Sequence, residues 1–206
     1  MKWNPLKWPL SCITGVLIPL IYWTFCIISA SLFLGKQFIG QAYNPFLMAL
    51  SDLGNIIYNP AGAIFYNLGL IFTGIVIFLF FIGINEFIDQ FINQKYFKLI
   101  QFLGYFTAIS LALIGVFPEN APFGLHGLWS IIFFIFAGID ILITCILIYF
   151  EEKISKWVIV VGLIIFSIDL ILGITMHPSA EFSIVIAVMV YVEIWVVYFF
   201  KFWDGG

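Results

Sequence analysis

The stretch "SIIFFIFAGIDILITCILIYF", Ser130–Phe150, decides the fold class, because Asp140 is the only charged residue in 21. About 20 consecutive apolar residues in a helix cross the hydrocarbon core of a bilayer. The whole chain of 206 residues has the same character, with 64% hydrophobic and 9% charged residues. Soluble domains average roughly 25% charged residues. The stretch therefore predicts a transmembrane helix within an integral membrane protein.

Apolar segments of this kind recur along the entire chain. Six are long enough to span a bilayer, at 10–35, 60–84, 97–117, 125–150, 156–175 and 181–201. The first follows Lys2 and Lys7 as a signal peptide would, but its apolar run far exceeds the roughly 7–15 residues of such a core, which favours a retained helix. No stretch is polar enough for a separate soluble domain. We therefore expect residues 1–206 to form a single all-α domain, a six-transmembrane-helix bundle.

The lysines orient the predicted bundle. The chain has eight lysines and no arginine. If the N-terminus is inside, seven lysines fall in cytoplasmic segments and only Lys36 falls outside, which is a strong positive-inside bias. We expect a multi-pass protein of the cell membrane with both termini cytoplasmic. The net charge of −3 gives no indication of nucleic acid as a partner.

Polar residues gather in the three connections on the predicted outer side. These are "YNPFLMALSDLGNIIYNP" (Tyr43–Pro60), "GVFPENAPFGLHGLW" (Gly115–Trp129) and "TMHPSAE" (Thr175–Glu181). The inner connections "NEFIDQFINQKYFK" (85–98) and "EEKISK" (151–156) carry mixed charges that are typical of solvated helix ends. The outer side is therefore where we expect a site.

The first outer connection predicts a short interfacial helix that lies on the bundle or dips into it. Asn44 can cap this helix with Pro45 at its first position, and Gly54 can end it. Four apolar residues would then share one face: Phe46, Leu47, Leu50 and Leu53. Polar residues at its end are placed to line a cavity: Ser51, Asp52 and Asn55.

Three carboxylic acids are predicted inside the membrane: Asp140, Asp169 and Glu193. An intramembrane Asp costs about 2.5–3.5 kcal/mol on insertion scales, so each should face the bundle and have a partner. No lysine is predicted at their depth. We expect them to be protonated, or hydrogen-bonded to one another, to Asn67 or to Thr144.

A polar stripe is predicted on the fourth segment. At 100° per residue, five residues fall within about 40° of one face: His126, Ser130, Ala137, Asp140 and Thr144. The stripe has two interpretations, which the sequence leaves open. It either makes polar contacts between helices or lines a functional cavity.

The candidate ligand-binding residues are Ser51, Asp52, Asn67, Glu119, His126 and His177, with Glu181 as a further acid–base group. His126, His177 and Glu119 make a minimal zinc set, but no HExxH or HxxxH spacing supports it, so we expect no metal. We expect no cofactor either, because a haem between the two histidines would lack an arginine for its propionates. No motif supports Ser51 as a nucleophile, and no catalytic residue is assigned.

Two stretches resemble the membrane family called domain of unknown function 998. The matching residues are Ser51, Gly54, Asn59–Pro60, Asn67–Gly69, Phe117–Pro118 and His126. The resemblance covers essentially all six segments. The family is similar in layout to the six-span FRAG/DRAM/SFK group, some of whose members act in lipid-anchor remodelling or lipid-linked processes. By analogy, this resemblance implies a role with lipids and no particular reaction.

Three functions follow from these observations. The leading one is a non-enzymatic protein whose outer cavity binds a lipid or another amphiphile, with the head group at the polar connections and the tail among Phe and Ile side chains. Its partners would be membrane lipids. The alternatives are an accessory subunit that binds other membrane protein subunits and a membrane-embedded lipid hydrolase, with or without zinc.

The segment "FPENAPFGLH", Phe117–His126, predicts a lid over the outer mouth of the bundle. Pro118 and Pro122 stiffen it by fixing φ. We expect Glu119 and His126 to point toward Asn67, Asp52 and His177. His126 should be buried, with a hydrogen-bond partner from another span or outer connection.

The predicted orientation is tested by cysteine labelling. A membrane-impermeant thiol reagent added outside intact cells should modify a cysteine introduced at Ala121 but not one introduced at Gln94, because these positions lie on opposite sides. The reverse pattern would move the polar connections to the cytoplasm.

Overall fold

The chain folds into six α-helices, and a computed structural model describes residues 7–38, 40–175, 178 and 180–203. The helices are α1 (Leu10–Ser31), α2 (Ala63–Gly83), α3 (Gln94–Val116), α4 (Leu125–Phe150), α5 (Trp157–Thr175) and α6 (Ala180–Phe202). No strand occurs in these ranges. Five helices, all except α5, are long and apolar enough to span a membrane. This is the architecture of a membrane protein.

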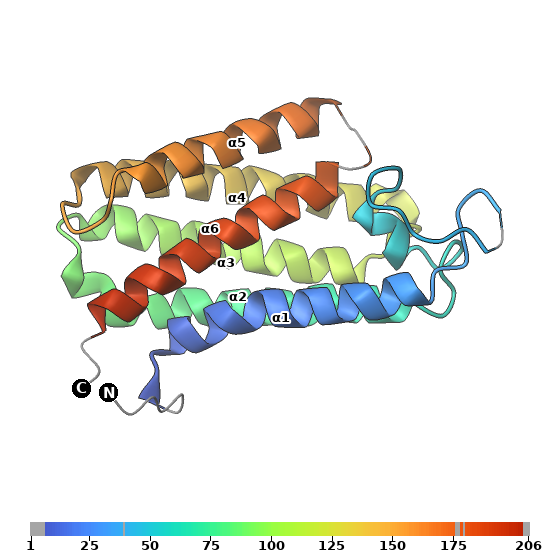
Figure 1. Cartoon of the computed structure of the whole chain (residues 1–206), viewed down its shortest axis with the longest axis horizontal. Helices are drawn as coiled ribbons and strands as arrows, with labels where there is room; N and C mark the ends of the chain where they lie inside the picture. Colours follow the sequence, from blue (N-terminus) through green and yellow to red (C-terminus); the bar gives the residue numbers. More distant parts are fainter. Residues whose placement is uncertain (1–6, 39, 176–177, 179, 204–206) are drawn as a thin grey trace.

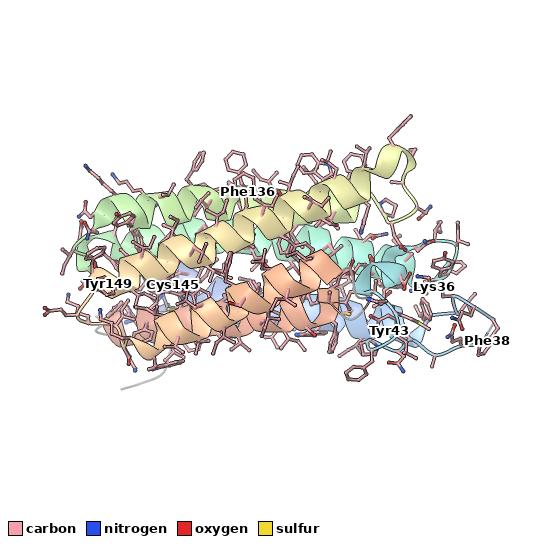
Figure 2. The ribbon with its side chains drawn as sticks, turned by 90° about the horizontal axis from the view of Figure 1, so that it is seen from above. Lys36, Phe38, Tyr43, Phe136, Cys145 and Tyr149 are labelled. Atoms are coloured by element: carbon pink, nitrogen blue, oxygen red, sulfur yellow. The ribbon has the colours of Figure 1, made fainter. Side chains whose placement is uncertain are left out.

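The helices form a ring in which each packs against its neighbours in sequence, and α6 closes the ring against α1. Figure 1 shows α1 beginning and α6 ending at one end of the bundle, which we call the terminal end. The connections α1–α2, α3–α4 and α5–α6 lie at the opposite end, the loop end. Figure 2 places Lys36, Phe38 and Tyr43 at the loop end and Tyr149 in the other half. The three polar connections thus share one end, as expected.

Each of the six predicted segments contains one helix. The largest difference concerns the first, which was expected to reach residue 35 but ends at Ser31. Gly35 has φ of +123°, a conformation that L side chains rarely adopt. The chain therefore turns here instead of continuing as a helix.

The short helix predicted for the first outer connection is wrong in its first half. Residues 45–47 form a turn, and a 3₁₀-helix, η2 (Leu50–Gly54), follows. The Asn44 side chain accepts the N–H of Phe46 at 2.9 Å, and Ala49 is extended with ψ of 153°, which interrupts the helix. Phe46 is 71% exposed whereas Leu53 is completely buried, so the four apolar residues do not share one face.

Buried polar side chains hold η2 inside the loop end, where it packs on α1, α2 and α6. The Asn59 side-chain nitrogen lies 2.9 Å from the Leu53 carbonyl oxygen and 2.9 Å from Ser29 Oγ. Ser29 Oγ also donates to the Leu53 carbonyl at 3.2 Å. Asn67 Nδ2 donates to the Gly54 carbonyl at 3.1 Å. The backbone of η2 is thus bound to α1 and α2.

Hydrogen bonds also fix the α4–α5 connection at the terminal end. Lys156 Nζ lies 2.6 Å from the Ile148 carbonyl and 2.7 Å from that of Glu151, so it caps the end of α4. Ser155 N–H donates to Tyr198 Oη of α6 at 3.1 Å. The expectation of a solvated connection is wrong for Glu151, which is 1% exposed and whose carboxylate accepts the Ile92 N–H.

Small residues bring α2 and α3 close together. A Cβ at Gly74 would lie 2.7 Å from the Ala108 carbonyl oxygen and 2.9 Å from Ala112 Cβ. Ala108 and Ala112 belong to a small-residue spacing of four that permits close helix approach in membranes. The backbones therefore meet at a place where no larger side chain fits.

Gly74→Ala should destabilise the protein by about 1–3 kcal/mol, because the added methyl group overpacks the α2–α3 contact. Gly127→Ala in α4 is the control, since a Cβ there would meet nothing within 4 Å. Thermal unfolding in detergent should show a lower Tm for Gly74→Ala alone. Equal Tm values for the two variants would show that the contact tolerates a methyl group.

Candidate functional site

A cavity of about 840 Å³ lies between α4, α5 and α6 and begins at the loop end. Ligand sites in proteins typically measure roughly 300–1,000 Å³. Along α4 the lining extends from His126 to Leu142, and these 16 steps correspond to roughly 24 Å of helix. We call this space the large cavity. It is long enough to hold an extended molecule.

The rim of the large cavity is polar and joins elements far apart in sequence. Glu181, in the first turn of α6, accepts the Ser51 backbone N–H at 2.8 Å and the Ser51 hydroxyl at 3.1 Å. A carboxylate in this position also complements the positive end of the α6 dipole. Ser51 and Glu181 both line the cavity. The bridge therefore fixes η2 against the start of α6.

Glu119 connects the rim to the α3–α4 connection. Its Oε2 accepts a hydrogen bond from Asn55 Nδ2 at 2.9 Å, and the neighbouring Asn120 Oδ1 accepts the Ile56 N–H at 3.3 Å. Glu119 is half-buried and lines the cavity. Glu119 thus binds the connection that contains Asp52, through Asn55 rather than through Asp52 or Asn67.

His126 also lines the large cavity, and its predicted burial is confirmed, with 7% of the residue exposed. Its Nδ1 lies 2.8 Å from the Phe117 carbonyl oxygen in the α3–α4 connection. A carbonyl only accepts, so Nδ1 carries the proton and a neutral ring leaves Nε2 as an acceptor. Ser130, one turn further along α4, donates its hydroxyl to the His126 carbonyl.

The tip of the α3–α4 connection points away from the cavity. Phe123 is 96% exposed and has φ of +62°, and Gly124 follows with φ of +64°. This pair of left-handed residues turns the chain into α4. The segment thus contributes Glu119 and His126 to the rim, while its aromatic tip does not cover the mouth.

Asp52 lies outside the lining of the large cavity. It is completely buried, and its Oδ1 forms an ion pair with Lys36 Nζ at 2.7 Å while Oδ2 accepts the Ala49 N–H. Burial lowers the pKa of Lys36, but the hydrogen bond and the charge of Asp52 outweigh it and the pKa is raised. Asp52 therefore ties down the α1–α2 connection.

The predicted polar stripe of α4 is divided between two spaces. His126 and Ser130 line the large cavity, whereas Asp140 and Thr144 line a second cavity of about 80 Å³ inside the ring. The sequence left open whether the stripe makes contacts between helices or lines a functional cavity. His126 and Ser130 match the functional cavity, whereas Asp140 and Thr144 lie among the helices around a small internal space. Residues near the loop end are accessible to a ligand of the large cavity, and Asp140 is not.

The intramembrane carboxyl groups lack the hydrogen bonds that were one of the two expectations for them, and the other, protonation, stays a prediction. In the described part of the chain, no hydrogen bond joins these three acids to one another, to Asn67 or to Thr144. One side-chain oxygen of each of three residues is buried without a partner: Asp140, Glu193 and Asn67. Asp169 lines the large cavity and is 8% exposed. It is the one of the three acids that a ligand of this cavity can reach.

The open side of the large cavity is apolar. Its lining includes five exposed side chains, Ile131, Ile135, Ile139, Leu170 and Ile174, from α4 and α5. Sequence reasoning did not select these residues, although the spacing of four along α4 places the first three on one face. They form an apolar wall that faces outward between the two helices.

The weak alternative of a metal site at His126, His177 and Glu119 includes His177, which lies outside the described residues. Within the described ranges, no three His, Cys, Asp or Glu side chains are grouped to hold a metal ion. Cys12, Cys26 and Cys145 are buried free thiols.

Comparison of the chain with protein-family models, with curated proteins and with solved structures found no match. The resemblance to domain of unknown function 998 therefore stays a prediction from the motif residues. The candidate site is defined by its geometry alone.

Glu181→Ala should lower the free energy of unfolding by on the order of 1–3 kcal/mol, because it leaves the Ser51 N–H and hydroxyl without an acceptor. Glu152→Ala, an exposed glutamate at the terminal end, is the matched control. Thermal unfolding in detergent should separate the two variants. If both unfold like the wild type, the bridge does not stabilise the loop end.

Proposed function

We propose that this protein is a non-enzymatic six-span membrane protein that binds a lipid or another amphiphile in the large cavity. The polar part of the ligand lies among Ser51, Glu119, His126 and Glu181 at the rim. Its apolar chain lies along the isoleucines of α4 and the facing side of α5. Membrane lipids are the source of such ligands.

One observation carries this proposal: a polar rim continues without interruption into an apolar wall that is open between α4 and α5. A ligand with a polar and an apolar end matches both parts. A purely polar solute would leave the apolar wall empty, whereas a purely apolar molecule would leave the rim groups without partners.

The proposal includes six spans with the loop end outside. The 19 residues of α5 give roughly 28 Å of helix, close to the thickness of a hydrocarbon core. Among the described residues, six lysines belong to the terminal half and only Lys36 to the loop end, which supports a cytoplasmic terminal end. The large cavity then opens in the outer leaflet.

The hydrogen bonds do not favour the hydrolase alternative. The Ser51 hydroxyl donates to Glu181, and His126 Nδ1 is bonded to the Phe117 carbonyl. A serine nucleophile needs a base that accepts its proton, commonly a histidine, within hydrogen-bonding distance. Ser51 and His126 form no such pair, so the hydrogen bonds give no support to a serine-dependent form of the hydrolase. Its zinc-dependent form includes His177, outside the described residues, and binding without reaction is the function that we propose.

Filling the mouth of the cavity tests the proposal. Gly127 lines the cavity, and a Cβ added there would meet nothing within 4 Å, so Gly127→Trp should fill the mouth without disturbing the fold. Native mass spectrometry of protein released from its own membranes should show a bound amphiphile on the wild type. Gly127→Trp should lose more than about half of it, since the tryptophan occupies the ligand's space.

Ile146→Trp is the matched control, because Ile146 is an exposed residue of α4 outside both cavities. It should keep the bound amphiphile. Equal occupancy in Gly127→Trp and Ile146→Trp would show that the large cavity is not the binding site.

A further inference from the structure

We propose that the amphiphile carries a positively charged amino or quaternary ammonium group and that Asp169 is its counter-ion. This inference rests on the proposed function and specifies the chemical class of the ligand. The observation behind it is a carboxyl group in the apolar part of the large cavity. Asp169 lines the large cavity, is 8% exposed, and makes no hydrogen bond or ion pair with the described residues.

The surroundings of Asp169 form a slot between α4 and α5. Gly138 of α4 lies opposite, where a Cβ would be 3.5 Å from Asp169 Oδ2 and 3.4 Å from the Phe166 ring. A methyl group here would already touch both neighbours, so the room for a larger group is that of the large cavity, which Gly138, Phe166 and Asp169 all line. A carboxylate and an aromatic ring together are the ordinary recognition elements for an ammonium group, through charge and cation–π attraction.

The charges around the cavity favour a cation over an anion. The other acidic residues of the lining are Glu119 and Glu181. Lys36, the lysine of the loop end in the described chain, is already paired with Asp52, and the sequence contains no arginine. His126, the basic residue in the described lining, directs Nδ1 to the Phe117 carbonyl. A phosphate or carboxylate head group would thus meet carboxylates without a compensating lysine or arginine.

The ammonium position agrees with an amphiphile. The lining ends about one turn below Gly138, at Leu142. The polar part of the ligand then reaches from the rim down to Asp169, roughly 18 Å along α4 from His126 to Gly138, and its apolar chain leaves sideways past the exposed isoleucines of α4 rather than deeper into the bundle. Asp169 faces the cation, and the apolar wall covers the chain.

The test compares three amphiphiles with the same sixteen-carbon chain and a trimethylammonium, a maltoside or a phosphate head group. Each is added to the full-length protein in neutral detergent, and binding is measured by native mass spectrometry and by the rise in Tm. The wild type should bind the trimethylammonium compound roughly tenfold more tightly than the maltoside and bind the phosphate compound most weakly. Asp169→Asn should lose the preference for the cation and keep its binding of the maltoside.

Two controls accompany this variant. Asp89→Asn removes an equal charge from an exposed residue of the terminal end and should keep the preference. The Tm of Asp169→Asn without ligand should equal that of the wild type, because asparagine replaces a carboxyl group that has no partner.

The outcomes separate the two proposals. If Asp169→Asn keeps the cation preference, or if the phosphate compound binds best, the inference is overturned while the proposed function stands. If none of the three compounds binds to the wild type, the proposed function itself is overturned.

Discussion

The loop end depends on one constraint: backbone that enters a helix bundle without forming an α-helix must find its hydrogen-bond partners within the protein. The 3₁₀-helix η2 is such a backbone. Its Leu53 carbonyl accepts from Asn59 and Ser29, its Gly54 carbonyl from Asn67, and its Ser51 N–H donates to Glu181. The partner residues belong to α1, α2 and α6, except Asn59, which lies just before α2. The rim of the large cavity exists because η2 is held there.

This arrangement explains why the polar residues of three separate connections form one site. The common partner is η2 together with Asn55, the residue that follows it. Ser51 binds Glu181 of α6, and Asn55 binds Glu119 of the α3–α4 connection. Both carboxylates line the large cavity. The same side chains thus hold the fold together and line the cavity, so a substitution of Glu181 changes the stability of the loop end as well as the rim.

The sequence predicts the helices well because an apolar run of membrane length depends only on local composition. It predicts the sharing of one end by the polar connections for the same reason. The contacts between residues cannot be predicted from local composition, because they depend on how the helices pack against one another. The stripe from His126 to Asp140 is one face of an isolated helix, but α4 lies between two cavities, and its rotation and tilt assign the ends of the stripe to different spaces. The partner of Glu119 is Asn55, 64 residues earlier in the chain, and local propensity does not reveal a contact over such a distance.

The hydrogen bonds of the α4–α5 connection anchor the first residues of α5 at the terminal end of the bundle. This end of α5 is fixed by Lys156 on the end of α4 and by Ser155 on Tyr198 of α6. The side chains of α5 that border the large cavity begin at Phe166 and lie in the half far from this anchor. A rotation of about 5° at the anchor would displace the other end of a roughly 28 Å helix by about 2.5 Å. A change in the tilt of α5 at this anchor would therefore change the width of the cavity between α4 and α5, although the anchoring residues Lys156, Ser155 and Tyr198 do not line it.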